Sequence, residues 1–395
     1  MLVAVLATTA LASCGRKSAA TLFAPAPPNG AARAQVGTKS VQSTGPLHLQ
    51  GTIGPGAQWE IDRPAEWNGE LVVWLHGYSN PAQPIALPNI TPIRDALLAR
   101  GYAVIYSSYS SSGYAVKEAT IEAHQLRGLF VAKVASPDRT YLVGVSLGGL
   151  VGALLSEKYP GQYNGTLLVS GVLGGSEAEL RYVGDVRVLF DAVYPGVLPG
   201  TLTEVPPGTD VNQTLTNALH AIQLNPNGLG VIAALARVKP EFSSGAELAQ
   251  SVLTAIGFQL QGANDLLSRT HGHSFYDNHD WNYTGPLPAT LLAQINAGVA
   301  RYSATPDAEE YVQHYGEPRG DLRIPVITMH DAFDPVVPSR HEGWYADAVA
   351  THGAGGHLLQ RKTVRYGHVA FTPGEILASF DDLTKWVETG VKPSN

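Results

Sequence analysis

The chain has 395 residues, which is enough for one large α/β domain with a sizeable insertion or for two domains. Hydrophobic residues make up 44% of the sequence and charged residues 15%, which excludes an intrinsically disordered chain. The formal net charge of −7, without any long basic run, argues against nucleic acid as a partner. The single cysteine excludes internal disulfides and cysteine metal sites.

The N-terminal segment predicts export from the cytoplasm. Residues 2–11 form a short apolar run, far below the ~20 residues that a membrane span needs. This run leads into Leu11-Ala12-Ser13-Cys14, which resembles the lipobox of bacterial lipoproteins, where the cysteine is lipidated and becomes the new N-terminus. No Lys or Arg precedes the run, as a signal requires, so we expect the true start a few residues upstream.

The sequence therefore predicts a signal and lipobox over residues 1–14, and an extracytoplasmic protein that Cys14 anchors to a membrane surface through lipid. An ordinary cleaved signal, which would give a secreted or periplasmic protein, and an apolar N-terminus without function are the alternatives. Residues 15–46 are rich in Ala, Pro, Gly, Ser and Thr and lack hydrophobic periodicity, so they predict a flexible tether.

The ordered part of the chain begins with a series of strands and helices. Alternating side chains over 47–53 and 58–63 predict two strands near an edge of a sheet. Residues 70–75 are apolar on both faces, as expected for a strand in the middle of a covered sheet, and they end in His76-Gly77-Tyr78. A helix over 93–100, a buried strand over 102–107 and a helix over 115–134 follow.

Residues 140–156 carry the strongest functional motif. A short buried strand at 141–143 runs into Gly144-Val145-Ser146-Leu147-Gly148, and small and apolar residues over 150–155 predict a helix. In a chain with 42 glycines, the bare G-x-S-x-G pattern arises by chance in roughly one case in four. The order strand, motif, helix is what makes it a nucleophile elbow, in which a strained serine exposes its hydroxyl. We identify Ser146 as the candidate nucleophile.

After a strand over 166–172, the alternation of strands and helices stops. Residues 176–320 predict a mainly helical cap insertion, with helices over 180–193, 215–224, 231–238, 246–260 and 288–300. Within it, residues 270–281 contain three histidines and two aspartates, so a zinc or calcium site is conceivable. Because the spacing falls in an irregular loop, we expect structural hydrogen bonds or a wall of a pocket there, and no metal.

The core resumes with a strand over 322–330, which runs into Asp331-Ala332-Phe333-Asp334-Pro335-Val336-Val337-Pro338. A helix over 342–353 and a strand over 357–365 come next, and a loop then carries His368. Thr372-Pro373-Gly374-Glu375 opens the last helix with a capping-box pattern and a proline in its first turn.

The order Ser146, Asp334, His368, together with His76-Gly77 after a central strand, resembles bacterial serine esterases and lipases of the α/β-hydrolase superfamily. The resemblance covers about residues 47–175 and 321–390. It implies the α/β-hydrolase fold, a mostly parallel sheet flanked by helices, with 47–175 and 321–395 as the core. It implies Ser146 as nucleophile, His368 as base and Asp334 as acid, and the backbone amides of Tyr78 and Leu147 as the oxyanion hole. Asp331 is the alternative acid; His341 and His357 are the alternative bases.

The activity implied by the resemblance is hydrolysis of a small or oligomeric carboxylic ester through an acyl-enzyme, without a cofactor. A prolyl-type serine peptidase uses the same triad and remains an alternative, although the sequence shows no blade-like repeat of the propeller that such enzymes often carry. A catalytically silent binding protein on the same fold is the second alternative. The apolar cap helices lead us to expect a preference for hydrophobic acyl groups.

Overall fold

The computed structural model describes residues 45–394, which belong to one compact unit. The predicted signal, the lipidation of Cys14 and the tether up to residue 44 lie outside this range and stay predictions. Within the described range, no helix has the length and apolar character needed to cross a membrane.

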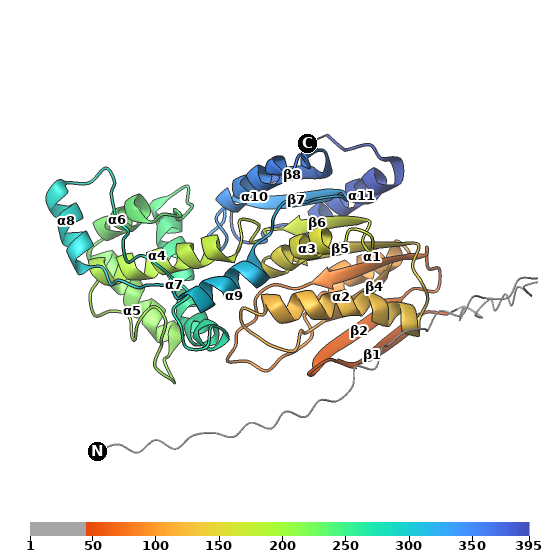
Figure 1. The fold of residues 1–395 in the computed structure, drawn as a ribbon, viewed down its shortest axis with the longest axis horizontal. Helices are drawn as coiled ribbons and strands as arrows, with labels where there is room; N and C mark the ends of the chain where they lie inside the picture. Colours follow the sequence, from red (N-terminus) through yellow and green to blue (C-terminus); the bar gives the residue numbers. More distant parts are fainter. Residues whose placement is uncertain (1–44, 395) are drawn as a thin grey trace, which may run out of the picture. The chain divides into compact units, whose positions relative to one another are not determined.

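The described residues form an eight-stranded sheet whose strand order is β1-β2-β4-β3-β5-β6-β7-β8 (Figure 1). Pairing is antiparallel between β1 and β2 and between β2 and β4, and parallel between all later neighbours. The fold class predicted from sequence is therefore confirmed. The strands are β1 (Leu47–Ile53), β2 (Ala57–Arg63), β3 (Glu70–Leu75), β4 (Ala103–Ser107), β5 (Arg139–Val145), β6 (Gly165–Val169), β7 (Val326–Phe333) and β8 (Leu358–Tyr366).

Helices cover both faces of the sheet, so its central strands are buried on both sides. In β3, Val72 and Trp74 pack against the face of α1 (Thr91–Ala99) and α11 (Pro373–Thr389). Leu71, Val73 and Leu75 pack on the opposite face, against α2 (Val116–Lys133) and α3 (Leu147–Lys158). Residues of α10 (Arg340–Thr351) pack against β6, β7 and β8. Successive side chains of β3 point to opposite faces of the sheet, and helices cover both faces. The residues that follow Glu70 in this strand are therefore all apolar.

The strand before the acidic loop differs from the prediction. It was expected over 322–330, whereas β7 runs from Val326 to Phe333. Pro325 lacks an N–H to donate to a neighbouring strand, so regular pairing begins only after it. Asp331 consequently belongs to β7 and pairs with Thr363 of β8, next to a register shift at Phe333.

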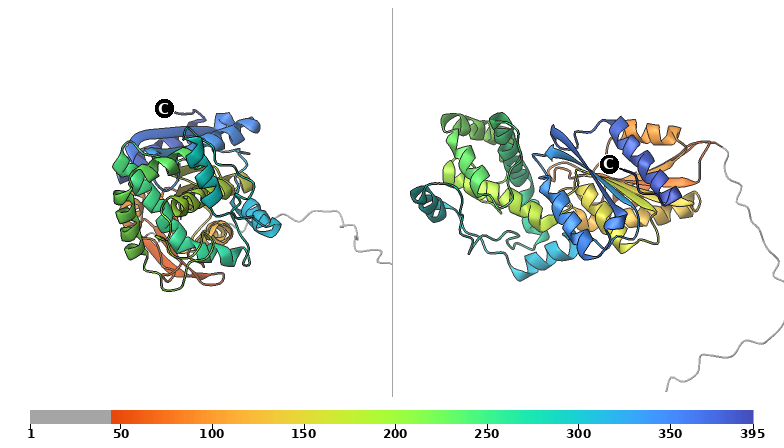
Figure 2. Two further views of the ribbon diagram at one scale, coloured as in Figure 1. Left: turned by 90° about the vertical axis from the view of Figure 1, so that its left-hand side faces the viewer. Right: turned by 90° about the horizontal axis from the view of Figure 1, so that it is seen from above.

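Between β6 and β7 the described residues form helices and no strand, and these helices gather beyond the sheet in Figure 2. They are α4 (Ser176–Val193), α5 (Val211–Leu224), α6 (Asn227–Leu235), α7 (Gly245–Arg269), α8 (Ala289–Gly298) and α9 (Pro306–Gly316). Five of them overlap the predicted ones, although α7 is longer than expected. The sixth, α9, was missed because few of its residues are apolar, yet Thr305 caps it and Pro306 opens it, which are readable start signals. The domain boundaries as such remain a prediction.

A buried ion pair holds the helical insertion together. Asp185 of α4 is fully buried and lies 2.7 Å from Arg237 Nη2 and 3.0 Å from Arg237 Nε. Tyr276, from the histidine-rich loop, donates its hydroxyl proton to Asp185 Oδ1 over 2.6 Å. In the same loop, Asn278 donates to the carbonyl of Ala300, while all three histidines are exposed. The loop therefore makes the structural hydrogen bonds that we expected.

Replacing Asp185 with alanine should lower the free energy of unfolding by about 3–5 kcal/mol, because Arg237 and the tyrosine hydroxyls would lose a buried partner. Urea denaturation followed by circular dichroism measures this loss. The matched control is Glu177→Ala in the same helix, where an exposed pair with Arg181 should contribute at most about 0.5 kcal/mol. Equal losses in the two variants would contradict the structural role of Asp185.

Candidate active site

Ser146 lies in the turn between β5 and α3, with φ of 54° and ψ of −124°. A positive φ is costly for a residue with a Cβ, so this is a strained position that the surroundings must hold in place. The backbone N–H of Ser146 donates to Val169 O over 2.9 Å, which ties the turn to the end of β6. The predicted strand, turn and helix are thus all present around this serine.

Two glycines of the motif allow this turn. A Cβ on Gly144 would lie 2.2 Å from the carbonyl oxygen of Gly148. A Cβ on Gly148 would lie 2.2 Å from the carbonyl oxygen of Leu75, at the end of β3. Either contact is far inside the van der Waals distance, so the backbone of α3 can approach β3 and β5 only with glycine at both positions.

The structure brings Ser146, His368 and Asp334 together from three separate loops. His368 Nε2 lies 2.8 Å from Ser146 Oγ, although the two residues are 222 positions apart. His368 Nδ1 lies 2.8 Å from Asp334 Oδ2. The histidine side chain is 17% exposed, whereas Asp334 is fully buried. The three groups meet where the parallel strands β5, β7 and β8 end, as sheets of this kind allow.

The two candidate acids occupy different places. Asp334 Oδ1 accepts hydrogen bonds from the backbone N–H groups of Val336, at 2.8 Å, and Val337, at 3.0 Å, which leaves Oδ2 for His368. Asp331 instead accepts from the backbone N–H of Ala370 over 3.0 Å. Its carboxylate therefore holds the loop that follows His368 and does not contact the imidazole.

The alternative histidines also lie elsewhere. His341 is fully buried in α10, and its Nδ1 accepts from the backbone N–H of Gly174 over 2.9 Å. Burial lowers the pKa of His341 to about 3, so the ring stays neutral. His357 ends a short 3-10 helix, Gly355–His357. Neither residue is among the hydrogen-bonding partners of Ser146 in the described part of the chain.

A buried histidine, which the sequence did not identify as part of the site, lies next to Asp334. His330 of β7 lies 3.2 Å from Glu342 Oε1 through Nδ1 and 2.9 Å from Val337 O through Nε2. Burial opposes its charge, but the hydrogen bond to Glu342 and the charges of Glu342 and Asp334 outweigh burial and raise its pKa to about 9. A cation therefore lies 3.6 Å from Asp334 Oδ2, on the side of the carboxylate away from the cavity. No motif could have distinguished this histidine, because its role comes from packing.

The two residues expected to supply oxyanion-binding amides flank Ser146. Leu147 is the first residue of α3, where a backbone N–H has no acceptor inside its own helix. Gly77, just before Tyr78, packs so closely that a Cβ there would lie 3.0 Å from the Cβ of Ser146. Tyr78 and Leu147 line the same cavity as Ser146. Their donor role remains a prediction.

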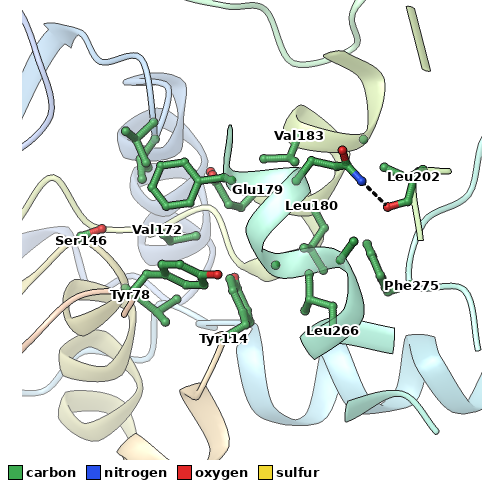
Figure 3. A pocket seen from close by; sticks show the side chains of 18 residues that line it. Tyr78, Tyr114, Ser146, Val172, Glu179, Leu180, Val183, Leu202, Leu266 and Phe275 are labelled. Carbon is green, nitrogen blue, oxygen red and sulfur yellow. Dashed lines mark hydrogen bonds between the residues drawn. The ribbon is translucent and has the colours of Figure 1, made fainter. Parts of the chain in front are cut away.

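A cavity opens beside Ser146, between the sheet edge and the helical insertion (Figure 3). The insertion supplies side chains of α4 and α7, and the core supplies the loops around the serine. Most lining side chains are apolar: Leu147, Val172, Leu180, Val183, Leu202, Phe258, Ala263, Leu266, Phe275, Val336 and Val337. The wall built by the insertion suits a hydrophobic group.

One carboxyl group interrupts this apolar wall. Glu179 of α4 is only 7% exposed, and burial, with a further contribution from the charge of Asp334, raises its pKa to about 8. Its Oε2 lies 3.3 Å from Nε2 of the neutral His341, without the geometry of a hydrogen bond. Glu179 is therefore a predominantly uncharged acid in the wall of the cavity that Ser146 also lines. The predicted helix began at residue 180, one position after Glu179, and the sequence gave no sign of this role.

Among the described residues, His48, Glu60 and Asp62 form a group that could hold a metal ion, with ligand atoms within 4.8 Å of one another. The group lies on β1 and β2, where His48 and Asp62 are register partners. Arg94 Nη1 lies 3.1 Å from Glu60 Oε1, so a cationic side chain already faces these carboxylates.

No protein-family model matches the sequence, and no curated protein matches it. Among solved structures, feruloyl esterase B from Aspergillus oryzae has a TM-score of 0.51 and 14% identity, over 88% of this chain and 82% of that one. An acylaminoacyl peptidase from Pyrococcus horikoshii has a TM-score of 0.45 and 10% identity, over 89% of this chain. This chain spans only 42% of that peptidase's length. Together with the strand order, the similarity to feruloyl esterase B shows that the chain has the α/β-hydrolase fold.

Glu179 makes the stability of the protein depend on pH. Its folded pKa of about 8 lies above its ordinary value, so its contribution is complete below about pH 4.5 and is lost as the pH rises through 8. Between pH 6 and pH 8, the free energy of unfolding should fall by about 2 kcal/mol more in the wild type than in Glu179→Gln. Urea titrations at the two pH values measure this difference.

The control is Glu177→Gln, which removes an exposed carboxyl two residues earlier in α4. Its pH dependence should match that of the wild type. A wild-type slope in Glu179→Gln would show that Glu179 is ionised and solvated, against the structure.

Proposed function

We propose that this protein is a serine hydrolase that cleaves carboxylic esters through an acyl-enzyme intermediate. The observation that supports this most is the continuous line of contacts from Ser146 Oγ through His368 to Asp334, each 2.8 Å long. The apolar cavity beside Ser146 provides room for the substrate. The fold is compatible with many activities, so the proposal depends on the site and not on the fold.

In this mechanism, His368 Nε2 accepts the proton of Ser146 as Oγ attacks the ester carbonyl carbon. Asp334 holds the imidazole through Nδ1 and stabilises the imidazolium that forms. The amides of Tyr78 and Leu147 donate to the developing oxyanion. His368 then returns the proton to the leaving alcohol, and later activates the water that hydrolyses the acyl-enzyme.

Substitution of the three residues tests the proposal. Ser146→Ala and His368→Ala should each lower kcat for a p-nitrophenyl ester by a factor of about 10³ or more, and Asp334→Asn by about 10⁴. A fluorophosphonate probe should label the wild type and fail to label Ser146→Ala. Circular dichroism confirms that each variant is folded.

Three outcomes would contradict the proposal. Near-normal turnover by Ser146→Ala would exclude this nucleophile, and absence of labelling in the wild type would favour a silent binding protein. Faster hydrolysis of aminoacyl amides than of esters would favour the peptidase alternative. Asp331→Asn serves as comparison for the acid: it should retain far more activity than Asp334→Asn, because it is Asp334, and not Asp331, that bonds the imidazole of His368.

We also propose that lipid on Cys14 anchors the enzyme to the cell envelope, on the basis of the lipobox-like Leu11-Ala12-Ser13-Cys14. When the gene is expressed with its full signal in a bacterial host, the protein should partition into the detergent phase of Triton X-114. Cys14→Ser should move it to the aqueous phase while the hydrolytic rate stays unchanged. Equal partitioning of the two forms would contradict the anchor.

A further inference from the structure

The cavity beside Ser146 contains two buried polar atoms that nothing in the described chain satisfies. These are the hydroxyl oxygen of Tyr78 and Oε2 of Glu179, both on lining residues. Buried polar groups almost always have a hydrogen-bond partner, and an unsatisfied one costs about 1–3 kcal/mol. Two such atoms in a single cavity call for a common explanation.

The other polar residues of the cavity wall show that the chain can satisfy its own groups there. Gln259 Nε2 donates to Leu202 O over 2.9 Å, as Figure 3 shows, and its Oε1 accepts from Arg187 over 2.6 Å. The hydroxyl of Tyr114 lies 2.9 Å from Ser176 Oγ. In the described cavity wall, the unsatisfied atoms therefore belong to Tyr78 and Glu179. Glu179 Oε2 lies 3.3 Å from His341 Nε2 but outside hydrogen-bond geometry, so a bound group would complete both lining residues.

The surroundings of Glu179 indicate the charge of that group. Tyr182 on its own helix, Tyr114 near the start of α2 and His341 on α10 are neutral neighbours. Asp334 after β7 is the anion whose charge acts on it, and the charge of His330 opposes that effect. Since no lysine or arginine is among its partners in the described chain, an anionic group would be repelled by Asp334.

The hydrogen-bonding capacity of the two residues indicates the chemistry. Burial raises the pKa of the Tyr78 hydroxyl, so it stays protonated and can donate or accept. An uncharged carboxylic acid at Glu179 can likewise donate and accept. A hydroxyl has the same dual capacity, whereas an ammonium group would require Glu179 to ionise inside an apolar wall.

We propose that the cavity takes an apolar substrate group that carries a hydroxyl, and that Tyr78 and Glu179 recognise this hydroxyl. The inference rests on the proposed ester hydrolysis and makes it more specific: the substrate is an ester of a hydroxylated acid or of a hydroxylated alcohol. The apolar body of that group packs against Leu180, Val183 and Phe275, while the two polar atoms fix its orientation.

Matched substrates test the recognition. The acyl arm compares ethyl 3-hydroxyhexanoate with ethyl hexanoate, and ethyl 3-(4-hydroxyphenyl)propanoate with ethyl 3-phenylpropanoate. The alcohol arm compares the acetates of 2-(4-hydroxyphenyl)ethanol and 2-phenylethanol, acetylated at the aliphatic oxygen. In one arm, kcat/KM should favour the hydroxylated ester by about 10-fold or more, and that arm identifies which side of the ester enters the cavity.

Variants then locate the preference. Glu179→Leu and Tyr78→Phe should each reduce the ratio of kcat/KM between hydroxylated and plain ester to within about 2-fold of unity, because each removes a hydrogen-bonding atom. Glu179→Gln, which still donates and accepts, should restore much of the ratio. Glu177→Gln, on the exposed side of the same helix, should leave both the rates and the ratio as in the wild type.

The recognition proposal is overturned by a ratio near unity in every pair, or by a wild-type ratio in Glu179→Leu. Faster hydrolysis of the 4-(aminomethyl)phenyl analogue than of the hydroxyphenyl ester would show a cation site instead. Each of these results leaves ester hydrolysis intact, so it is distinct from failure of the proposed function. If no ester is hydrolysed at all, calorimetric titration of 3-(4-hydroxyphenyl)propanol and 3-phenylpropanol decides the recognition alone.

Discussion

The close contact between the start of α3 and the end of β3 is the constraint on which the site depends. Gly148 lies so near the carbonyl of Leu75 that no side chain fits, and Ser146 is held with a positive φ as a result. This geometry directs the serine away from the helix that follows it. It also places the loop after β3 beside the serine, so that one packing contact positions both the nucleophile and the expected oxyanion-binding residues.

The helical insertion contributes more than a cover. Glu241, between α6 and α7, accepts hydrogen bonds from the backbone N–H and the hydroxyl of Ser339, at 2.7 and 2.8 Å. Ser339 follows the loop that carries Asp334, so the insertion helps to hold the acid in place. With Glu179 and Phe258 it also builds the cavity wall. Changes in the insertion are therefore expected to affect both substrate choice and the geometry of Asp334 and His368.

Local sequence patterns predicted most of the elements, although not α9 or the bounds of β7, and the chain order of Ser146, Asp334 and His368 predicted their meeting. The apolar runs that became β3 and β5 are unambiguous because both faces of these strands are buried. The sequence favoured Asp334 over Asp331 through a resemblance. The structure gives the physical reason: Asp331 lies within β7, and its carboxylate accepts a hydrogen bond from the loop that follows His368. His330 and Glu179 could not be predicted, because their properties arise from neighbours distant in sequence.

The charge of Asp334 contributes to the opposite states of these two groups, in addition to burial at Glu179 and to the contact with Glu342 at His330. The charge of Asp334 raises the pKa of both His330 and Glu179. A raised pKa keeps a base such as His330 charged and keeps an acid such as Glu179 uncharged. Asp334 therefore has the cation of His330 on one side and favours an uncharged carboxyl at Glu179 on the cavity side. In this way a polar group can remain in an otherwise apolar substrate cavity.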